Sequence, residues 1–287
     1  MNEPDTRKIQ LSDGRQLSYS DIGTGDNGTW IHCHGIPGSR YELTHLNKEL
    51  VAAGLRIIVP DRPGYGASTP CPSYDFRQHT ADLCQLADHS GLKRFSVSGF
   101  SGGGVFALAL AHGLGARVEQ LSIAATPAVP LMENPFDYAS ELTAGSWHAA
   151  LADMHQFADQ LQSLTGPDNA LADGMMDAVG AKEKQHLSSA RIQPAFRQSM
   201  NTALQQGALE SASALARDTR LTAQPWPFHP AELKLPVRII HGTDDHLVHR
   251  QHFRALFNQI PQSKQVSPEG KGHFEVLPWM FVADYTA

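Results

Sequence analysis

The sequence predicts an α/β protein with a mostly parallel central sheet, helices on both faces and one long helical insertion. Two observations carry this prediction. Short apolar runs alternate with helical stretches from the start to about residue 125, and the alternation resumes after residue 236. Between these regions only helical patterns are evident. The content of 41% hydrophobic and 18% charged residues is that of an ordinary globular protein.

Strands are predicted from short apolar runs of the kind that suits buried parallel strands. The first two runs flank Asp13-Gly14, a dipeptide that favours a hairpin turn. The predicted strands cover residues 8–11, 16–22, 29–33, 55–59, 95–98, 120–124, 237–241 and 265–267.

Helices are predicted between these strands. Each of the helices expected at 39–53, 75–90 and 102–112 is followed by a glycine, which supplies the left-handed conformation that ends a helix. Two further helices are expected, at about 251–258 and at the C-terminus.

The insertion is marked by the stripe Trp147, Leu151, Met154, Ala158 and Leu161, whose steps of three and four residues are typical of an amphipathic helix. A cluster of prolines ends this helical section. The sequence therefore predicts one α/β core domain of residues 1–128 and 226–287, interrupted by a helical cap, or lid, of residues 129–225.

Charge and composition exclude several classes of protein. A formal net charge of −6 argues against nucleic acid or an anionic membrane as the partner. Neither a signal peptide nor an apolar run long enough to span a bilayer is visible. Cys33, Cys71 and Cys84 give no disulfide framework, which indicates a reducing compartment. We expect a cytoplasmic monomer or homodimer that acts on a small molecule.

Two patterns point to cofactors only superficially. The glycines at 23, 25 and 28 have the spacing of a dinucleotide-binding loop, but a strand follows where a helix is required, so we expect a hairpin loop. His32 and His34 share a strand face, yet no third ligand has the spacing of a known metal site. The sequence predicts neither cofactor nor metal.

The strongest local signal is Gly99-Phe100-Ser101-Gly102-Gly103, where a strand ends and a helix begins. This context is that of a nucleophile elbow, in which the serine is held in a strained backbone conformation on a tight turn. Bulk two residues before or after the serine would clash with the neighbouring backbone. The elbow exposes the Ser101 hydroxyl above the positive end of the helix and directs the N–H of Gly102 at an oxyanion beside it.

A second signal, His34-Gly35-Ile36-Pro37-Gly38, follows the strand at 29–33 and leaves unpaired amides at the carboxyl edge of the sheet. The amide of Ile36 is our candidate for the second oxyanion donor. A third segment, residues 61–68, reads Asp-Arg-Pro-Gly-Tyr-Gly-Ala-Ser. We interpret it as architectural, with Asp61 and Arg62 holding a sharp loop in place by hydrogen bonds.

These three segments, in this order, resemble the α/β-hydrolase fold superfamily and, more narrowly, its cap-bearing esterases and hydrolases. The resemblance covers about residues 7–125 and 226–285, whereas the insertion matches only in position. It implies that an acid and then a histidine base follow the serine in the chain. The family pattern places the acid at Asp245, with Asp244 as the competing choice, and the base at His273 in a glycine-flanked loop.

The resemblance implies a serine hydrolase, and we expect a carboxylesterase that cleaves short to medium acyl esters through an acyl-enzyme on Ser101. The alternatives are a lactonase or a C–C bond hydrolase, and then an aminopeptidase resembling proline iminopeptidase. An aminopeptidase needs acidic cap residues, for which Glu133, Asp137 and Glu141 are available. A ligand-binding receptor on the same fold is the alternative outside enzymes.

The insertion should roof Ser101, because a segment that follows the strand at 120–124 emerges at the carboxyl edge of the sheet. The candidate substrate-binding residues are Phe100 of the elbow and Met132, Trp147, Met154 and Phe157 of the insertion. For the four insertion residues, packing within the cap is the alternative interpretation.

Overall fold

The computed structural model describes residues 6–165, 170–260 and 262–282. Its eight-stranded sheet has the order β1-β2-β4-β3-β5-β6-β7-β8. Neighbouring strands from β4 through β8 in this order are parallel, while β2 pairs antiparallel with β1 and β4. The strands are β1 Arg7–Gln10, β2 Gln16–Gly23, β3 Thr29–Cys33, β4 Arg56–Pro60, β5 Phe95–Phe100, β6 Val118–Ala124, β7 Val237–Ile240 and β8 Ser263–Val266. The predicted mostly parallel sheet is confirmed.

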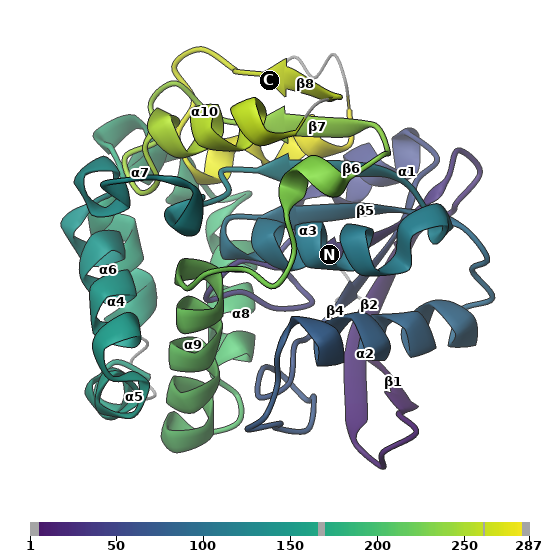
Figure 1. Cartoon of the computed structure of the whole chain (residues 1–287), viewed down its shortest axis with the longest axis horizontal. Helices are drawn as coiled ribbons and strands as arrows, with labels where there is room; N and C mark the ends of the chain where they lie inside the picture. The colour runs from purple at the N-terminus through teal and green to yellow at the C-terminus, as the bar shows by residue number, and fades with distance from the viewer. Residues whose placement is uncertain (1–5, 166–169, 261, 283–287) are drawn as a thin grey trace.

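Helices cover both faces of this sheet, as predicted (Figure 1). One face packs against α2 (Phe76–His89), α3 (Gly102–Leu114) and α10 (Arg250–Gln259). The other packs against α1 (Asn47–Ala52) and the 3₁₀ helix η6 (Phe274–Met280). Alternation along β4 supplies both cores, because Ile58 faces the first while Ile57 and Val59 face the second.

One predicted loop and one predicted helix differ from the structure. The hairpin at Gly14 joins β1 to β2 as expected. The loop from Gly23 to Gly28 is not a hairpin, because β4 lies between β2 and β3 in the sheet. The helix predicted at 39–53 is reduced to η1 (Thr44–Leu46) and α1. Its first residues are held instead by side chains, as when the N–H of Arg40 donates to Asp61.

Gly113 does not end the helix of the elbow, which continues to Leu114. A Cβ on Gly113 would lie 2.7 Å from Cγ2 of Thr80 on α2. This glycine therefore allows α2 and α3 to approach each other, and the left-handed glycine that follows the helix is Gly115, with φ 47°. The predicted C-terminal helix is also different, since η6 is a 3₁₀ helix.

The segment between β6 and β7 is helical. We call its helices α4 to α9 the cap. They gather at one side of the sheet (Figure 1). The helical elements of the segment are η3 Val129–Leu131, η4 Pro135–Tyr138, α4 Glu141–Ala152, α5 Met154–Gln162, α6 Ala170–Ala178, α7 Ala181–Leu187, α8 Gln193–Ala203, α9 Ala208–Ala223 and η5 Pro230–Glu232.

The apolar stripe predicted as one helix belongs to two helices, α4 and α5. Asp153 separates them in an extended conformation with φ −150° and ψ 104°. Its carboxylate accepts the N–H groups of His155 and Gln156, which caps the start of α5. The side chain of Asp153 thus breaks a pattern that hydrophobicity alone would continue.

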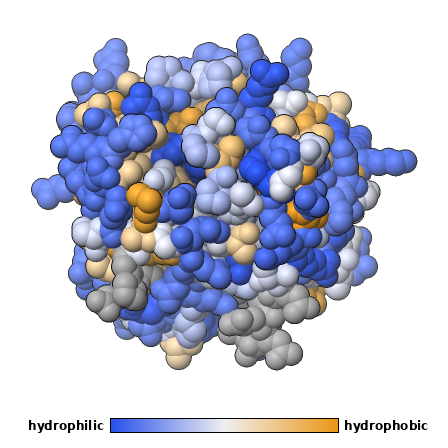
Figure 2. All heavy atoms as spheres, turned by 90° about the horizontal axis from the view of Figure 1, so that it is seen from below, coloured by the Kyte–Doolittle hydropathy of each residue, from blue (hydrophilic) through white to orange (hydrophobic). Residues whose placement is uncertain are grey.

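The face of the molecule seen from below in the orientation of Figure 1 is mostly hydrophilic, and its hydrophobic residues lie scattered (Figure 2). Within residues 6–282, apart from the two gaps named above, no helix combines the length and the apolar character that crossing a bilayer requires.

Candidate active site

Ser101 occupies a tight turn between β5 and α3, with φ 52° and ψ −129°. For a residue with a side chain this backbone conformation is strained by about 1–3 kcal/mol, and such strain is common at functional sites. The N–H of Ser101 donates to the carbonyl of Ala124, which ties the turn to the end of β6. The sequence predicts this conformation, and the structure has it.

Glycines on both sides of Ser101 make the turn possible. A Cβ on Gly99 would lie 2.4 Å from the carbonyl oxygen of Gly103. A Cβ on Gly103 would lie 2.2 Å from the carbonyl oxygens of Cys33 and His34. No real Cβ approaches backbone this closely, so α3 can begin against β3 only with these glycines.

His273 and Asp245 form a hydrogen-bonded pair, with 2.8 Å between Nδ1 of the histidine and Oδ2 of the aspartate. Both residues are buried. The other carboxylate oxygen of Asp245 accepts the N–H groups of Leu247 and Val248 at 2.9 and 3.0 Å, which fixes its orientation. The competing candidate Asp244 is exposed, with its carboxylate beside the hydroxyl of Thr243.

The loops that carry these two residues are bonded to each other. We call residues 242–249 the acid loop and residues 267–273 the histidine loop. The N–H groups of Thr243 and Asp244 donate to the carbonyls of Pro268 and Lys271. A Cβ on Gly242 would lie 2.1 Å from the carbonyl oxygen of Lys271. The geometry of the Asp245–His273 pair is therefore set by backbone as well as by side chains.

Electrostatics within this pair stabilise a proton on His273 and the ionised form of Asp245, relative to the free side chains. Burial lowers the pKa of His273, but the charge and hydrogen bond of Asp245 outweigh burial, and Glu183 and Glu42 add to them, so the pKa is raised. Burial raises the pKa of Asp245, but the neighbouring His273 and His241 reverse this, so the carboxyl pKa is lowered. Asp245 is thus ionised at neutral pH and supports a proton on His273.

The two predicted oxyanion donors are neighbours. A Cβ on Gly102 would lie 2.5 Å from Cδ1 of Ile36, so the Ile36 side chain covers the start of α3. The N–H of Gly102 belongs to the first turn of the helix, where N–H groups lack intrahelical partners. Both residues line the cavity that contains the Ser101 side chain.

The loop that carries Ile36 is held by charged side chains. The N–H of Gly35 donates to Oε1 of Glu42 at 2.9 Å. The guanidinium of Arg62 donates to the carbonyls of His34 and Gly35. The sequence predicts that Arg62 holds its own loop, whereas in the structure it holds the loop of Ile36.

Arg62 itself is neutralised by the cap. Its Nε donates to Oδ2 of Asp218 on α9 at 2.6 Å, and both side chains are buried. Arg217 donates to the other oxygen of the same carboxylate. A buried ion pair thus joins a cap helix to the Ile36 loop.

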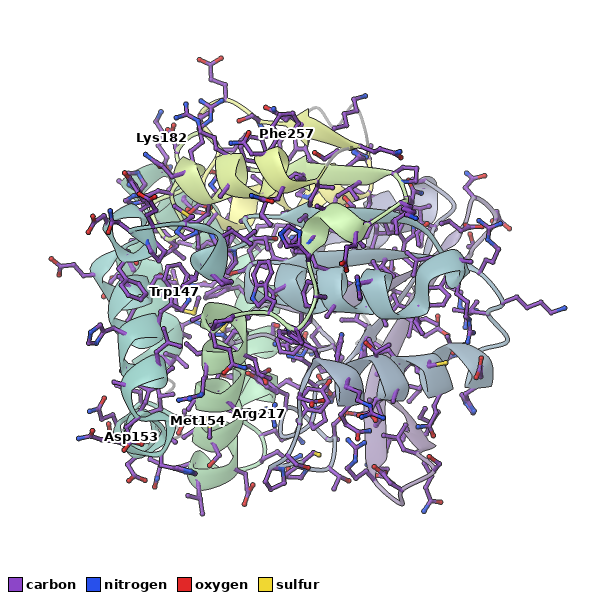
Figure 3. All side chains as sticks on the ribbon, viewed as in Figure 1. Trp147, Asp153, Met154, Lys182, Arg217 and Phe257 are labelled. Atoms are coloured by element: carbon purple, nitrogen blue, oxygen red, sulfur yellow. The ribbon has the colours of Figure 1, made fainter. Side chains whose placement is uncertain are left out.

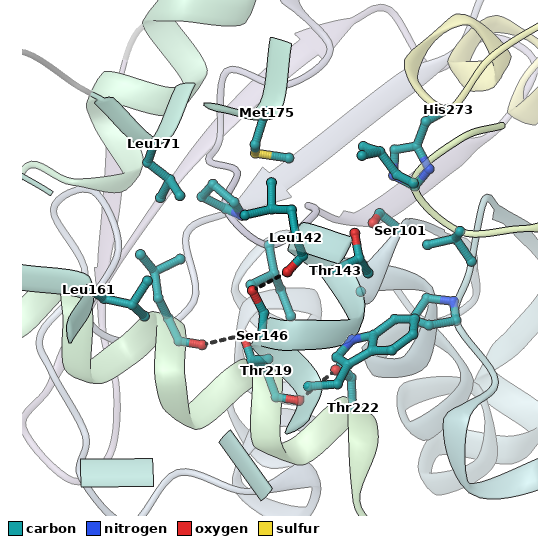
Figure 4. A pocket seen from close by; sticks show the side chains of 18 of the residues that line it. Ser101, Leu142, Thr143, Ser146, Leu161, Leu171, Met175, Thr219, Thr222 and His273 are labelled. Atoms are coloured by element: carbon teal, nitrogen blue, oxygen red, sulfur yellow. Dashed lines mark hydrogen bonds between the residues drawn. The ribbon is translucent and has the colours of Figure 1, made fainter. Parts of the chain in front are cut away.

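A cavity of about 110 Å³ lies between the core loops and the cap, and Ser101 and His273 line the same end of it (Figure 4). Leu142, which is 40% exposed, lies at its rim. The core contributes Ile36, Pro37, Ser101, Gly102, Pro127, Leu247, Val248 and His273. The cap contributes Leu142, Thr143, Ser146, Trp147, Phe157, Leu161, Leu171, Met175, Leu215, Thr219 and Thr222.

The candidate substrate-binding residues divide into two groups. Trp147 and Phe157 line the cavity as expected. Phe100, Met132 and Met154 do not, which corrects the prediction. The Phe100 ring is buried beneath His273, with ring centroids 5.0 Å apart. Met132 packs against the core on the α3 side, and Met154 packs among cap helices, near their lower end in Figure 3.

The polar character of the cap side of the cavity was not predicted from the sequence. Four hydroxyls line it, those of Thr143, Ser146, Thr219 and Thr222. Small hydroxyl residues within helices give no sequence signal, because they are common on any helix. Among the described residues that line the cavity, His273 alone is ionisable, and the acidic candidates Glu133, Asp137 and Glu141 lie elsewhere.

Known proteins share this architecture. Residues 31–277 match the family model described as alpha/beta hydrolase fold. A non-heme haloperoxidase of Rhodococcus erythropolis is 31% identical over 247 residues, which cover 84% of this chain and 82% of that protein.

Solved structures show the same fold at lower identity. An esterase from Thermogutta terrifontis has a TM-score of 0.70 at 22% identity, covering 95% of this chain and 92% of its own. The enol-lactonase from Burkholderia xenovorans has a TM-score of 0.68 at 19% identity, with 94% of each chain covered. The residues of the family match include the elbow, the acid loop and His273. The chain belongs to the alpha/beta hydrolase fold family.

Proposed function

We propose that this protein is a serine hydrolase, and specifically a carboxylesterase that acts on uncharged short to medium acyl esters. One observation carries the proposal: Ser101 on its strained turn and the buried His273–Asp245 pair meet at one end of a mostly apolar cavity. A nucleophile, a base and an acid that orients the base are what acyl transfer through a covalent intermediate requires.

In the proposed reaction the Ser101 hydroxyl attacks the ester carbonyl carbon while His273 takes its proton. Because Nδ1 of His273 is bonded to Asp245, Nε2 is the nitrogen that receives the proton. The N–H groups of Ile36 and Gly102 stabilise the oxyanion of the tetrahedral intermediate. The imidazolium then protonates the leaving alcohol, and water, activated by His273, releases the acid from Ser101.

The cavity favours neutral substrates over charged ones. The side chains that line it are apolar apart from Ser101, the four cap hydroxyls and His273, so a substrate ammonium group would be desolvated without a counter-charge. This argues against an aminopeptidase. Lactones remain the nearest alternative, because a cyclic ester meets the same nucleophile and the same oxyanion donors.

The experiment compares wild type with Ser101→Ala in p-nitrophenyl butyrate hydrolysis and in labelling by a fluorophosphonate probe. We expect the variant to lose the label and at least about a thousand-fold in kcat, since the triad acts as a unit. Ser213→Ala is the control, because Ser213 is exposed on α9 outside the cavity. Activity of Ser101→Ala above a tenth of wild type would contradict the mechanism, and a wild type without label or turnover would favour a ligand receptor.

The haloperoxidase relative suggests a second candidate reaction of the same acyl-enzyme. Hydrogen peroxide in place of water would attack the acyl group on Ser101 and release a peracid, leaving the serine free. The test uses acetate as the source of the acyl group and follows the oxidation of bromide by the peracid that is released. It compares wild type with Ser101→Ala in acetate buffer with hydrogen peroxide. Equal rates in both would leave ester hydrolysis as the sole proposed activity.

A further inference from the structure

Glu183, on cap helix α7, places a buried carboxyl group against the histidine loop. The residue is 2% exposed. Its Oε1 accepts the N–H of Phe274, the residue that follows His273. A Cβ on Gly272 would lie 2.1 Å from Oε2 of Glu183, so this glycine leaves the space that the carboxyl group fills. The carboxyl group thus packs on the backbone from Gly272 to Phe274.

One oxygen of this group lacks a protein partner. Oε2 of Glu183 is buried and makes no hydrogen bond among the described residues. Burial of a carboxylate oxygen without a partner is unfavourable unless a positive charge is nearby or the group takes up a proton. Burial raises the pKa of Glu183 to about 7, against the lowering effects of His273 and of the Phe274 N–H. Near neutral pH the group therefore exists in both charge states.

The positive charge that Glu183 faces forms during the reaction. Asp245 repels the carboxylate, whereas a protonated His273 attracts it. Lys271 on the same loop is already paired with Glu275 at 3.2 Å. The other charged or titratable groups on α7 and beside its start are Lys182, Lys184, His186 and His246, of which Lys184 is paired with Asp177.

We propose that Glu183 is a positioning residue for His273. From the cap it fixes the backbone of the histidine loop, and its carboxylate stabilises the positive charge that His273 acquires on taking the proton of Ser101. The inference rests on the proposed function, in which His273 is the base. Neither substrate nor transferred proton contacts Glu183 in this scheme.

If Glu183 had only a structural role, its replacement by glutamine would leave the pKa of His273 unchanged, whereas our proposal predicts a change. In Glu183→Gln the amide oxygen can still accept the Phe274 N–H, so loop anchoring is retained while the charge is removed. The pKa of His273 should fall in this variant, because the imidazolium loses a neighbouring negative charge. We expect a fall of about half a unit to one unit for a charge at this range in a protein interior.

The test is an NMR titration of the His273 imidazole, whose signal is assigned by its absence from His273→Ala. Asp177→Asn is the matched control, since it removes one negative charge from the cap next to α7 but at a residue whose side chain is 70% exposed. The midpoint of the acid limb of kcat/KM should move down together with the NMR value in Glu183→Gln. An unchanged His273 pKa in Glu183→Gln, or an equal change in Asp177→Asn, overturns the proposal.

Loop anchoring is tested separately with Glu183→Ala, which removes the acceptor of the Phe274 N–H. We expect kcat to fall further in this variant than in Glu183→Gln, with partial rescue by the amide. If the alanine variant does not fold, as judged by near-UV circular dichroism, the comparison of Glu183→Gln with wild type still shows whether the charge of Glu183 affects the pKa of His273. A shifted His273 pKa in a protein without ester hydrolysis supports the coupling of the two residues and overturns the proposed function instead.

Discussion

At the residue scale, the orientation of His273 depends on one carboxylate, and this makes Asp245 the most sensitive position after Ser101. Asp245→Asn preserves the shape but offers an amide to Nδ1, so the histidine can adopt the wrong tautomer. We expect kcat near neutral pH to fall by about 10⁴, as in the comparable serine-protease variant. Steady-state hydrolysis of p-nitrophenyl butyrate measures this fall.

The adjacent aspartate provides the control. Asp244 is exposed and contacts Thr243 rather than His273, so Asp244→Asn should change kcat by less than about threefold. If Asp244→Asn proved the more damaging of the two, the acid would be misassigned by one residue.

The pH dependence follows from the raised pKa of His273. Only neutral imidazole can accept the Ser101 proton, so kcat/KM is lost as the pH falls through the pKa of His273. Because that pKa is raised above its ordinary value of about 6.5, half of kcat/KM should be lost at a pH above 6.5. A profile of kcat/KM from pH 5 to 9 measures the midpoint. A midpoint below pH 6 would contradict the assignment of His273, with its raised pKa, as the base.

The proposed nucleophile and the proposed base stand out in the local sequence, but the residues that support them do not. Ser101 lies in a glycine-rich turn and His273 in a glycine-flanked loop, and both contexts have a backbone requirement that the sequence reveals. Glu183 lies on a short polar helix 90 residues away from His273, where nothing local distinguishes it. Gly272 is one of the glycines that flank His273, but the sequence does not say that a carboxyl group packs against it.

At the scale of elements, α9 and the Ile36 loop depend on each other through Asp218 and Arg62. Asp218→Asn would leave the buried guanidinium without its counter-charge, and breaking such a pair destabilises a protein by about 3–5 kcal/mol. The same change frees the carbonyls of His34 and Gly35 to move, so kcat should fall as well. Urea unfolding gives the free energy, and ester hydrolysis gives kcat.

An exposed pair serves for comparison. Asp173→Asn breaks the ion pair between Asp173 and Arg197, whose side chains are 55% and 41% exposed, respectively. This variant should change the free energy of unfolding by less than about 1 kcal/mol. Equal effects of Asp173→Asn and Asp218→Asn would show that burial does not decide the strength of these pairs here.

The ends of helices were the least predictable part of the elements. Gly113 has the appearance of a helix stop but serves close packing against Thr80, and this use depends on a neighbour far away in the sequence. Asp153 ends one helix and caps the next through its own side chain, whereas the apolar stripe runs on without interruption. Periodicity identified which residues are buried and did not identify where the chain turns.

At the scale of the whole molecule, we expect the cap to limit the size of the substrate. The cavity has a volume of about 110 Å³. Buried carboxyl groups of the cap bind Arg62, which holds the Ile36 loop, and the backbone next to His273. We expect kcat/KM for p-nitrophenyl acetate, butyrate and octanoate to exceed that for palmitate by at least about tenfold, a difference of about 1.4 kcal/mol. No activation should occur on emulsified triolein, and fastest turnover on palmitate or triolein would reveal a long acyl channel.

The core could be predicted in order and type because its strands are short apolar runs between glycine-bounded helices. The shape of the cavity could not, because it arises from side chains of α4, α5, α6 and α9 that meet only in three dimensions. Of the apolar stripe, Trp147 and Leu161 line the cavity, while Met154 packs among cap helices. Periodicity alone therefore does not separate the residues that line the cavity from those that pack within the cap.

The buried pair of Arg62 and Asp218 also bears on how new specificities can be engineered into this scaffold. If the whole insertion were replaced by a foreign one, Arg62 would lose its counter-charge Asp218. The Ile36 loop, which Arg62 holds, would then be free to move. A chimaera therefore has to retain α7 and α9 and take its new sequence in α4 to α6. Those three helices supply most of the cap residues that line the cavity. A library of variants confined to them would therefore vary the substrate specificity while leaving Asp218 and Glu183 in place.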